Sequence, residues 1–371
     1  MGSVTLSAEL HVVIASPGGV AGGGGVGSVS REISDWLRQR RPDVPVTVID
    51  TRGEGPAALS IVFLLSSLIR LVICRLSGAT LVHLQVTERG SFIRKGMIQR
   101  AARVLGMRTI AHHHGAEFIK HYPTASGDQQ RWIAETLRKA DLNAVLSEQM
   151  RSFLTNELGV EQERVHVLRN AVADVGYGCR TASDDRTMHV LMVANLSPRK
   201  GVSTFLATVA EMSRQGREVR ATLAGGGQVD RYVHEAAALG IADRCTFTGW
   251  IAHAGIETLL RSADALVLPS LDEGLPMAIL EALSAGVPVV ATPVGAIPEV
   301  LTSERDCLLV PPEDVPALTQ AMLRLCDDDC LRQRLRQDGR ALYERLFQID
   351  AFMERLLSLY RIALQPENPA P

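Results

Sequence analysis

Short apolar runs alternate along the chain with segments whose apolar residues recur every three or four positions. In the first half, six such runs are typical of strands buried on both faces of a parallel sheet. They are residues 11–16, 44–50, 79–84, 108–114, 142–147 and 164–170. Between them lie helix-period segments, such as the one with Val29, Ile33 and Leu37 on one face. This alternation predicts a doubly wound α/β domain.

The same alternation restarts at Met188 and gives six further predicted strands. They are residues 188–195, 219–225, 244–249, 265–270, 287–292 and 306–311. Two such runs predict two Rossmann-like doubly wound domains that face each other across a cleft, with ligands at the carboxyl ends of the strands.

The expected domain boundaries follow from a linker rich in Gly, Ser and Asp at residues 171–186. We expect an N-terminal domain at 1–175 and a C-terminal domain at 186–345. A C-terminal helix and tail, 346–371, form a further segment that is able to cross back to the N-terminal domain.

Composition is that of an ordinary globular protein, but charge is unevenly distributed. The chain has 371 residues, 46% hydrophobic and 22% charged, with a net charge of −2. Up to Asn170 there are 20 basic and 15 acidic residues, so the first part carries +5 and the remainder −7. A basic first half indicates an anionic surface or substrate. With only 4% aromatic residues, a protein that stacks single-stranded nucleic acid is not expected.

The sequence predicts a cytoplasmic protein. The first ten residues lack the basic and apolar segments of a secretory leader, and the six cysteines form no CxxC pair, which fits reduced thiols. The most apolar stretch, 57–76, has its first charge at Arg70, which leaves less than the roughly 20 residues that a membrane span needs. We expect a buried or interfacial helix there, which allows contact with the cytoplasmic face of a membrane.

Two glutamates stand eight residues apart in the segment 269–290. Glu273 follows a predicted strand, and Glu281 falls within a helix that Pro276 is placed to open and Gly286 to end. A carboxylate accepts two hydroxyl hydrogen bonds in parallel, which suits the vicinal diol of a ribose or hexose. Two solvated glutamates are the competing interpretation.

A basic pair follows the first strand of the second half. Ser197 can cap a helix and Pro198 can open it, which would place Arg199 and Lys200 in its first turn. A helix N-terminus with two cations is a favourable site for a diphosphate. A solvated basic turn is the alternative.

A glycine-rich loop, residues 16–27, joins the first strand to the first helix. Glycine lets the backbone approach a phosphate or a sugar closely. The loop lacks a clean GxGxxG pattern, although Asp50 stands where a dinucleotide site would have its acid. A flexible loop without ligand contact is the alternative.

Three adjacent histidines end the strand at 108–114. Because alternate residues share a face of a strand, only His112 and His114 could hold one ion. No cysteine or acid supplies a third ligand, so no metal is expected. Buried structural histidines are the alternative for His112 and His113.

Arg94 and Lys95 belong to a cationic segment, 82–108, that follows the apolar stretch in sequence. Such a segment predicts contact with a membrane surface or a lipid pyrophosphate. A solvated helix face is an equal alternative.

Together these motifs resemble those of the retaining glycosyltransferases of family 4, also called group 1, of the kind found in bacterial polysaccharide biosynthesis. The pair Glu273 and Glu281 is similar to the family's E-x7-E element, and the resemblance covers most of 188–343. The chain departs from the family at Ala194 and Asn195, where a Gly-Arg pair is usual. The resemblance implies a GT-B fold, which agrees with the two predicted domains.

The resemblance also implies roles for single residues. Glu273 would contact the donor sugar, Glu281 the ribose, and His114 would line the acceptor side. The residues implied in catalysis are His114, Arg199, Lys200 and Glu273. The residues implied in donor binding are Gly18, Gly19, Arg199, Lys200, Glu273, Gly274, Leu275, Pro276 and Glu281.

The expected function is a metal-independent hexosyltransferase without a cofactor. It would move a hexose from a nucleoside-diphosphate sugar to a saccharide in polysaccharide or glycan biosynthesis. The segment around Arg94 and Lys95 resembles that of exopolysaccharide members and favours a polyprenyl-pyrophosphate-linked acceptor. Two alternatives stay open at this point: a nucleotide-sugar epimerase on the same fold, and a non-catalytic partner subunit that binds nucleotide sugar.

Overall fold

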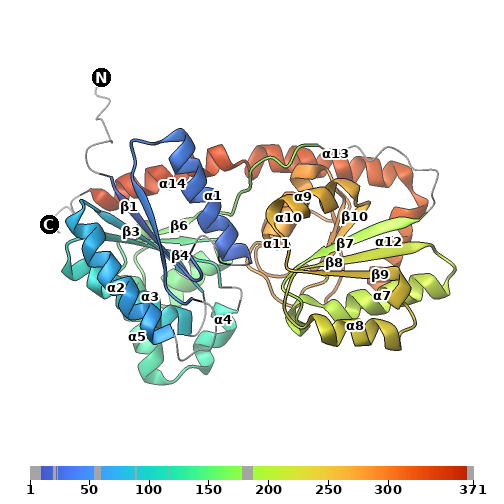
Figure 1. Cartoon of the computed structure of the whole chain (residues 1–371), viewed down its shortest axis with the longest axis horizontal. Helices are drawn as coiled ribbons and strands as arrows, with labels where there is room; N and C mark the ends of the chain where they lie inside the picture. Colours follow the sequence, from blue (N-terminus) through green and yellow to red (C-terminus); the bar gives the residue numbers. More distant parts are fainter. Residues whose placement is uncertain are drawn as a thin grey trace. The chain divides into compact units, whose positions relative to one another are not determined.

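The chain forms two compact units, each built on one six-stranded parallel sheet (Figure 1). The computed structural model describes residues 10–19, 22, 24–53, 60–87, 90–115, 117–177 and 187–365. The first unit comprises Met1–Asn170 and Ile349–Pro371, and the second Ala171–Gln348. Parts of the predicted helix at 57–76, of the linker and of the tail, namely 57–59, 178–186 and 366–371, lie outside the described residues.

The sheet of the first unit has the strand order β2-β1-β3-β4-β5-β6. Its strands are β1 (Val12–Ser16), β2 (Val46–Asp50), β3 (Leu81–Val86), β4 (Arg108–His113), β5 (Leu142–Val145) and β6 (Val165–Val167). All neighbours run parallel, and each strand corresponds to one predicted apolar run. The side chains of β1 and β3 are buried on both faces, because helices cover both sides of the sheet.

Helices of the first unit form two layers (Figure 1). The helices are α1 (Gly25–Arg40), α2 (Ser60–Leu76), α3 (Gly90–Val104), α4 (Phe118–His121), α5 (Gly127–Arg138), α6 (Glu148–Ser152) and α14 (Ile349–Leu364). On one side α2 contacts α3 and α3 contacts α5, while α1 contacts α14. The last helix therefore belongs to the first unit. Its Tyr360 is fully buried, with the hydroxyl 2.7 Å from His83 Nδ1.

The sheet of the second unit has the order β12-β11-β10-β7-β8-β9 and is also parallel. Its strands are β7 (Met188–Val193), β8 (Val219–Ala224), β9 (Cys245–Gly249), β10 (Ala265–Leu268), β11 (Val289–Ala291) and β12 (Leu308–Leu309). Its helices are α7 (Val202–Arg214), α8 (Val229–Ala238), α9 (His253–Ser262), α10 (Met277–Ala285), α11 (Ile297–Val300), α12 (Val315–Asp327) and α13 (Asp329–Leu346). The predicted fold class, two doubly wound α/β units, is confirmed.

Each sheet reverses its winding direction at its first strand. The strand β1 lies between β2 and β3, and β7 lies between β8 and β10. The connections on the two sides lead away in opposite directions, and α/β proteins bind their ligands at the carboxyl ends of strands beside such a switch point. Ligand sites are therefore expected in the loops after β1 and β3 in the first unit, and in those after β7 and β10 in the second.

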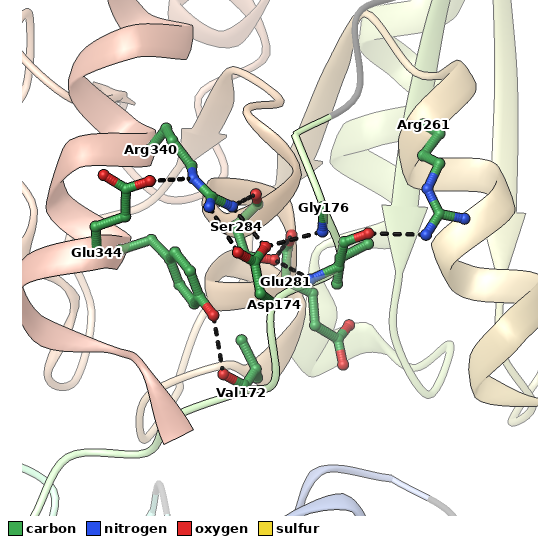
Figure 2. A network of polar contacts seen from close by, with 10 residues as sticks. Val172, Asp174, Gly176, Arg261, Glu281, Ser284, Arg340 and Glu344 are labelled. Atoms are coloured by element: carbon green, nitrogen blue, oxygen red, sulfur yellow. Dashed lines mark hydrogen bonds and ion pairs between the residues drawn. The ribbon is translucent and has the colours of Figure 1, made fainter. Parts of the chain in front are cut away.

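The described part of the predicted linker, 171–177, is anchored to the second unit by polar contacts (Figure 2). Arg340 of α13 meets both carboxylate oxygens of Asp174 at 2.6 Å and also donates to the carbonyl of Ser284. The Ser284 hydroxyl in turn donates to the carbonyl of Glu281 at 2.9 Å. The chain entering the unit is thus tied to α10, which is buried along its whole length.

We expect Asp174 and Arg340 to couple by about 1 kcal/mol, because a charge-assisted pair with two contacts is strong but Asp174 is half exposed. A double-mutant cycle of Asp174→Asn and Arg340→Gln, measured by urea unfolding, gives this coupling directly.

The coupling energy between Asp174 and Arg340 is also expected to depend on pH. The hydrogen bond from Arg340 lowers the pKa of the Asp174 carboxyl in the folded protein. The coupling is therefore complete above the ordinary carboxyl pKa of about 3.9 and is lost as the pH falls through the lower folded-state value. The prediction would be contradicted if the losses of unfolding free energy in the two single variants simply added at neutral pH. A coupling energy that persists in strong acid would contradict it as well.

Candidate functional site

The loops after β7 and β10 meet at the switch point of the second unit. Lys200 Nζ lies 2.5 Å from Glu273 Oε1. Arg199 donates from its guanidinium to the carbonyl of Asp272 at 2.8 Å, and the Leu271 N–H donates to the carbonyl of Arg199 at 2.8 Å. Three predicted donor-site residues from two loops, Arg199, Lys200 and Glu273, are therefore neighbours in space.

Glu273 is a buried carboxylate, only 5% exposed. Its Oε1 accepts hydrogen bonds from Lys200 and from the Ser270 hydroxyl, the latter at 2.7 Å. Among the residues that the structure describes, no donor reaches Oε2, so this oxygen is the one the side chain can offer to a ligand. Sequence reasoning missed Ser270, because a serine at the end of a strand carries no signal of its own.

Arg199 and Lys200 lie in a short helix that Pro198 opens, as predicted, but this is a 3-10 helix and not the first turn of α7. Pro198–Lys200 form a single 3-10 turn, and α7 begins only after Gly201. Gly201 has a φ of 69°, and a Cβ there would lie 1.9 Å from the carbonyl oxygen of Pro269. The backbone can pass this point only as glycine in the left-handed region. The basic pair thus sits on a separate turn packed against the loop after β10.

Glu281 lies on α10, which ends at Gly286 as predicted. Pro276 is the residue before the helix, so it precedes the first turn. The Glu281 side chain is 7% exposed, and its Oε1 lies 3.7 Å from Nδ1 of His253, the first residue of α9. A lone histidine gave no reason to expect this neighbour.

The backbone between the two glutamates is held by the turn that begins at Gly295. The Ala296 N–H donates to the carbonyl of Gly274 at 2.9 Å. Gly295 has a φ of 58°, and a Cβ there would lie 1.8 Å from the carbonyl oxygen of Glu273. This contact sets the path through Gly274 to Leu275, which is 3% exposed.

In the first unit, Asp50 closes the glycine turn after β1. Its Oδ1 accepts hydrogen bonds from the N–H groups of Gly18, Arg52 and Gly53 at 2.8–2.9 Å. The Gly19 N–H donates to a carbonyl of β1 at 3.3 Å. The amides of Gly18 and Gly19 are thus engaged within the unit, and Asp50 supports this loop as a structural acid.

The basic pair on α3 divides into a buried and a half-buried residue. Lys95 is 1% exposed and its Nζ donates to the Thr51 hydroxyl, so the predicted membrane contact of Lys95 is wrong. Burial, and next the charge of Arg94, lower the pKa of Lys95 to about 7. The Nε of Arg94 is buried without a hydrogen-bond partner in the described part of the chain. Burial, and next Arg52, lower the pKa of Arg94.

His114 follows β4 and is half buried, with Nε2 2.5 Å from Gln85 Oε1 on β3. Burial, and next the neighbouring His83 and His113, lower the pKa of His114 to about 3. Its ring is therefore neutral at pH 7. In this unit His114 can donate or accept a hydrogen bond but carries no charge.

His112 and His113 are buried, as the structural interpretation predicted. His112 Nδ1 lies 3.2 Å from His83 Nε2, and His113 Nε2 lies 3.2 Å from Asn143 Oδ1. Within the described residues, no three His, Cys, Asp or Glu side chains gather into a group that could hold a metal ion.

Comparison with known families matches both units. A family described as "Glycosyl transferases group 1" matches residues 187–328, and one described as "Glycosyl transferase 4-like domain" matches residues 6–171. Alpha-D-kanosaminyltransferase of Streptomyces kanamyceticus is 27% identical over 278 residues, which cover 70% of this chain and 72% of that protein. Further curated relatives are matched over 45% to 64% of their own length.

Solved structures show the same fold. Sucrose-phosphate synthase from Thermosynechococcus elongatus has a TM-score of 0.79 at 19% identity, covering 95% of this chain and 98% of that one. HepE from Anabaena, in complex with UDP-glucose, has a TM-score of 0.75 at 17% identity, covering 95% and 99%. Both units and their sheets thus have the architecture of GT-B glycosyltransferases. Since the two family matches together span most of both units, the chain belongs to the group 1, or family 4, glycosyltransferases.

Proposed function

We propose that the protein is a retaining, metal-independent hexosyltransferase that uses a nucleoside-diphosphate sugar and a lipid-linked saccharide acceptor in polysaccharide or glycan biosynthesis. The observation that carries this proposal is the contact of Lys200 with Glu273, beside Arg199, at the switch point of the second unit. Transfer from such a donor needs cations at the leaving diphosphate and polar groups around the sugar, and this site combines both.

The second unit would bind the donor. Arg199 and Lys200 would neutralise the diphosphate, which supplies the charge compensation that a metal ion provides elsewhere. The open Oε2 of Glu273 would accept a hydrogen bond from a sugar hydroxyl, and the buried Glu281 would hold the ribose diol. The complex of the similarly folded HepE with UDP-glucose supports a donor of this class.

In the proposed reaction the bond between the anomeric carbon and the diphosphate oxygen breaks. The acceptor hydroxyl oxygen forms the new bond on the same face of the sugar, and its proton passes to the leaving diphosphate. Negative charge grows on the diphosphate as the bond breaks, so Arg199 and Lys200 act most strongly in the transition state. No protein nucleophile is needed for these steps.

The first unit would bind the anionic part of the acceptor. Lys95 and Arg94 lie on the helix that follows β3, at the switch point of that unit. In the described residues no carboxylate lies within ion-pair distance of Lys95, although a buried cation is costly unless an anion compensates it. Arg94 would contact the diphosphate of a lipid-linked acceptor, with Lys95 behind it adding positive potential.

Nucleoside diphosphates are expected to raise the thermal midpoint of unfolding, because a ligand that binds only the folded state stabilises that state. At a ligand concentration of a hundred times Kd, the free energy of unfolding rises by about 2.7 kcal/mol. Thermal shift against UDP, GDP, ADP and their sugars identifies the cognate nucleotide. Lys200→Met should lose the shift, whereas Arg217→Gln, at an exposed arginine of the same unit, should keep it. A full shift in Lys200→Met would contradict the donor site.

Glu273→Gln is expected to lower kcat by about 100- to 1000-fold, because it removes a charged group that orients the sugar and Lys200. Release of nucleoside diphosphate and the anomeric configuration of the product are measured with EDTA present throughout. Glu218→Gln, at an exposed glutamate of the same unit, is the matched control and should keep wild-type turnover. An inverted product, or activity abolished by EDTA, would overturn the proposed mechanism.

Arg94→Gln is expected to raise KM for a lipid diphosphate acceptor by about tenfold or more, because a charge-assisted hydrogen bond is lost. KM for the donor should not change, and neither should transfer to a soluble saccharide without a diphosphate. Arg131→Gln, at an exposed arginine of α5, serves as the control. Equal effects on both acceptors would argue for a structural role of Arg94.

A further inference from the structure

One face of α2 is apolar and exposed to solvent. Seven of its large apolar residues are 43–83% exposed, namely Ile61, Val62, Leu65, Ile69, Val72, Ile73 and Leu76. At about 3.6 residues per turn they fall within an arc of about 120° of the helix. The opposite face packs on the unit through Leu64 and Leu71, which are 8% and 0% exposed. The helix therefore has apolar side chains on two faces: one face packs on the unit and the other is exposed to solvent.

The helix α3 lies beside α2 (Figure 1) and also has exposed apolar residues. Its Ile93, Met97 and Val104 are 47%, 41% and 88% exposed. Within the described residues, ten of the fifteen exposed large apolar side chains lie on α2 and α3. Scattered exposed apolar residues are normal, but a patch this concentrated is typical of an interaction site.

The charged residues of the two helices themselves are all positive. The described helices α2 and α3 contain six basic and no acidic residues. Arg70, Arg75 and Arg103 are exposed beside the apolar stripe. Two copies of this surface would bring like charges together, whereas anionic lipid would meet both the arginines and the apolar side chains.

The size of the helices favours a position on a bilayer surface. None of the helices in the described part of the chain is long and apolar enough to cross a membrane. A helix of 17 residues, such as α2, is about 25 Å long and can lie in the interface with one face among the acyl chains.

We propose that the exposed faces of α2 and α3 form a docking surface for an anionic lipid bilayer. This inference deepens the proposed function, on which it rests for the lipid-linked acceptor, because such an acceptor is presented at a bilayer surface. The docking surface lies on the first unit and does not include Lys95, which is buried, whereas the donor residues belong to the second unit.

The test is co-sedimentation of the full chain with vesicles of equal parts phosphatidylglycerol and phosphatidylcholine, and with phosphatidylcholine vesicles alone. Wild type should bind the anionic vesicles, more weakly as salt rises. The double variant Leu65→Glu, Ile69→Glu should lower the partition coefficient about a hundredfold, because two apolar side chains no longer enter the bilayer. Arg70→Gln and Arg75→Gln should each lower it about fivefold.

Ile362→Glu is the matched control, at an exposed apolar residue on α14 of the same unit, and should bind as wild type does. Because Leu65 and Ile69 are exposed, circular dichroism and the thermal midpoint should show that the double variant folds. Wild type that stays in solution with anionic vesicles, or a double variant that binds as well as wild type, would overturn the proposal.

Self-association is measured in parallel by analytical ultracentrifugation. A dimer that Leu65→Glu, Ile69→Glu abolishes, without vesicle binding by wild type, would assign the surface to a second copy and overturn the proposal. Vesicle binding is measured without donor or acceptor, and transfer to a soluble saccharide is measured without vesicles. Failure of docking and failure of the proposed activity are therefore distinguishable.

Discussion

The ion pair between Lys200 and Glu273 joins the loops that follow β7 and β10 in the second unit, where we propose the donor binds. Its side chains are only 14% and 6% exposed, so both ions give up much of their hydration. Such a pair persists only when its geometry is good and further hydrogen bonds support it, as the Ser270 hydroxyl does here. A diphosphate beside Lys200 would supply the same compensating charge as Glu273, so that donor and carboxylate compete for one cation.

The two switch points share a topology but differ in charge balance. At the second, Glu273 compensates Lys200. At the first, Lys95 donates to a neutral hydroxyl, and one carboxylate oxygen of Asp50 already receives three backbone N–H groups. In the described residues no carboxylate lies within ion-pair distance of Lys95, and Asp50 acts on the charges of Lys95 and Arg94 only from farther away. The unit whose cations have the weaker compensation is also the one with the more basic sequence, so the excess of positive charge counted in the sequence includes Arg94 and Lys95.

The central strands were predictable because helices cover both faces of each sheet, so that almost all residues of strands such as β1, β3 and β10 are buried. The end of α10 at Gly286 was predictable because its signal lies within the segment. The start of α7 was not, since the Ser-Pro pattern fits a 3-10 turn as well as a helix, and Pro269, far away in sequence, imposes glycine at position 201. The order of the strands in each sheet could not be predicted either, because no short segment of the sequence determines which strands become neighbours.

The burial of Lys95 illustrates the same limit. Adjacent residues Arg94 and Lys95 look equivalent in sequence, but the helix turns about 100° between them. One side chain is left half exposed, and the other is directed to Thr51 beneath it. Likewise, His253 beside Glu281 and Gln85 beside His114 come from separate elements, and only the packing of those elements brings the pairs together.

The assignment of α14 to the first unit determines the order in which the molecule can be completed during synthesis. Residues 1–170 leave the ribosome first, but the face of β4 against which α14 packs stays uncovered until the last helix is made. His83 and His112 then lack Tyr360 and Phe352, their partners from that helix. The second unit is continuous in sequence and can close earlier. The half that is translated first is thus the half that finishes last, and a chain interrupted before residue 349 would carry a whole second unit beside an unfinished first one.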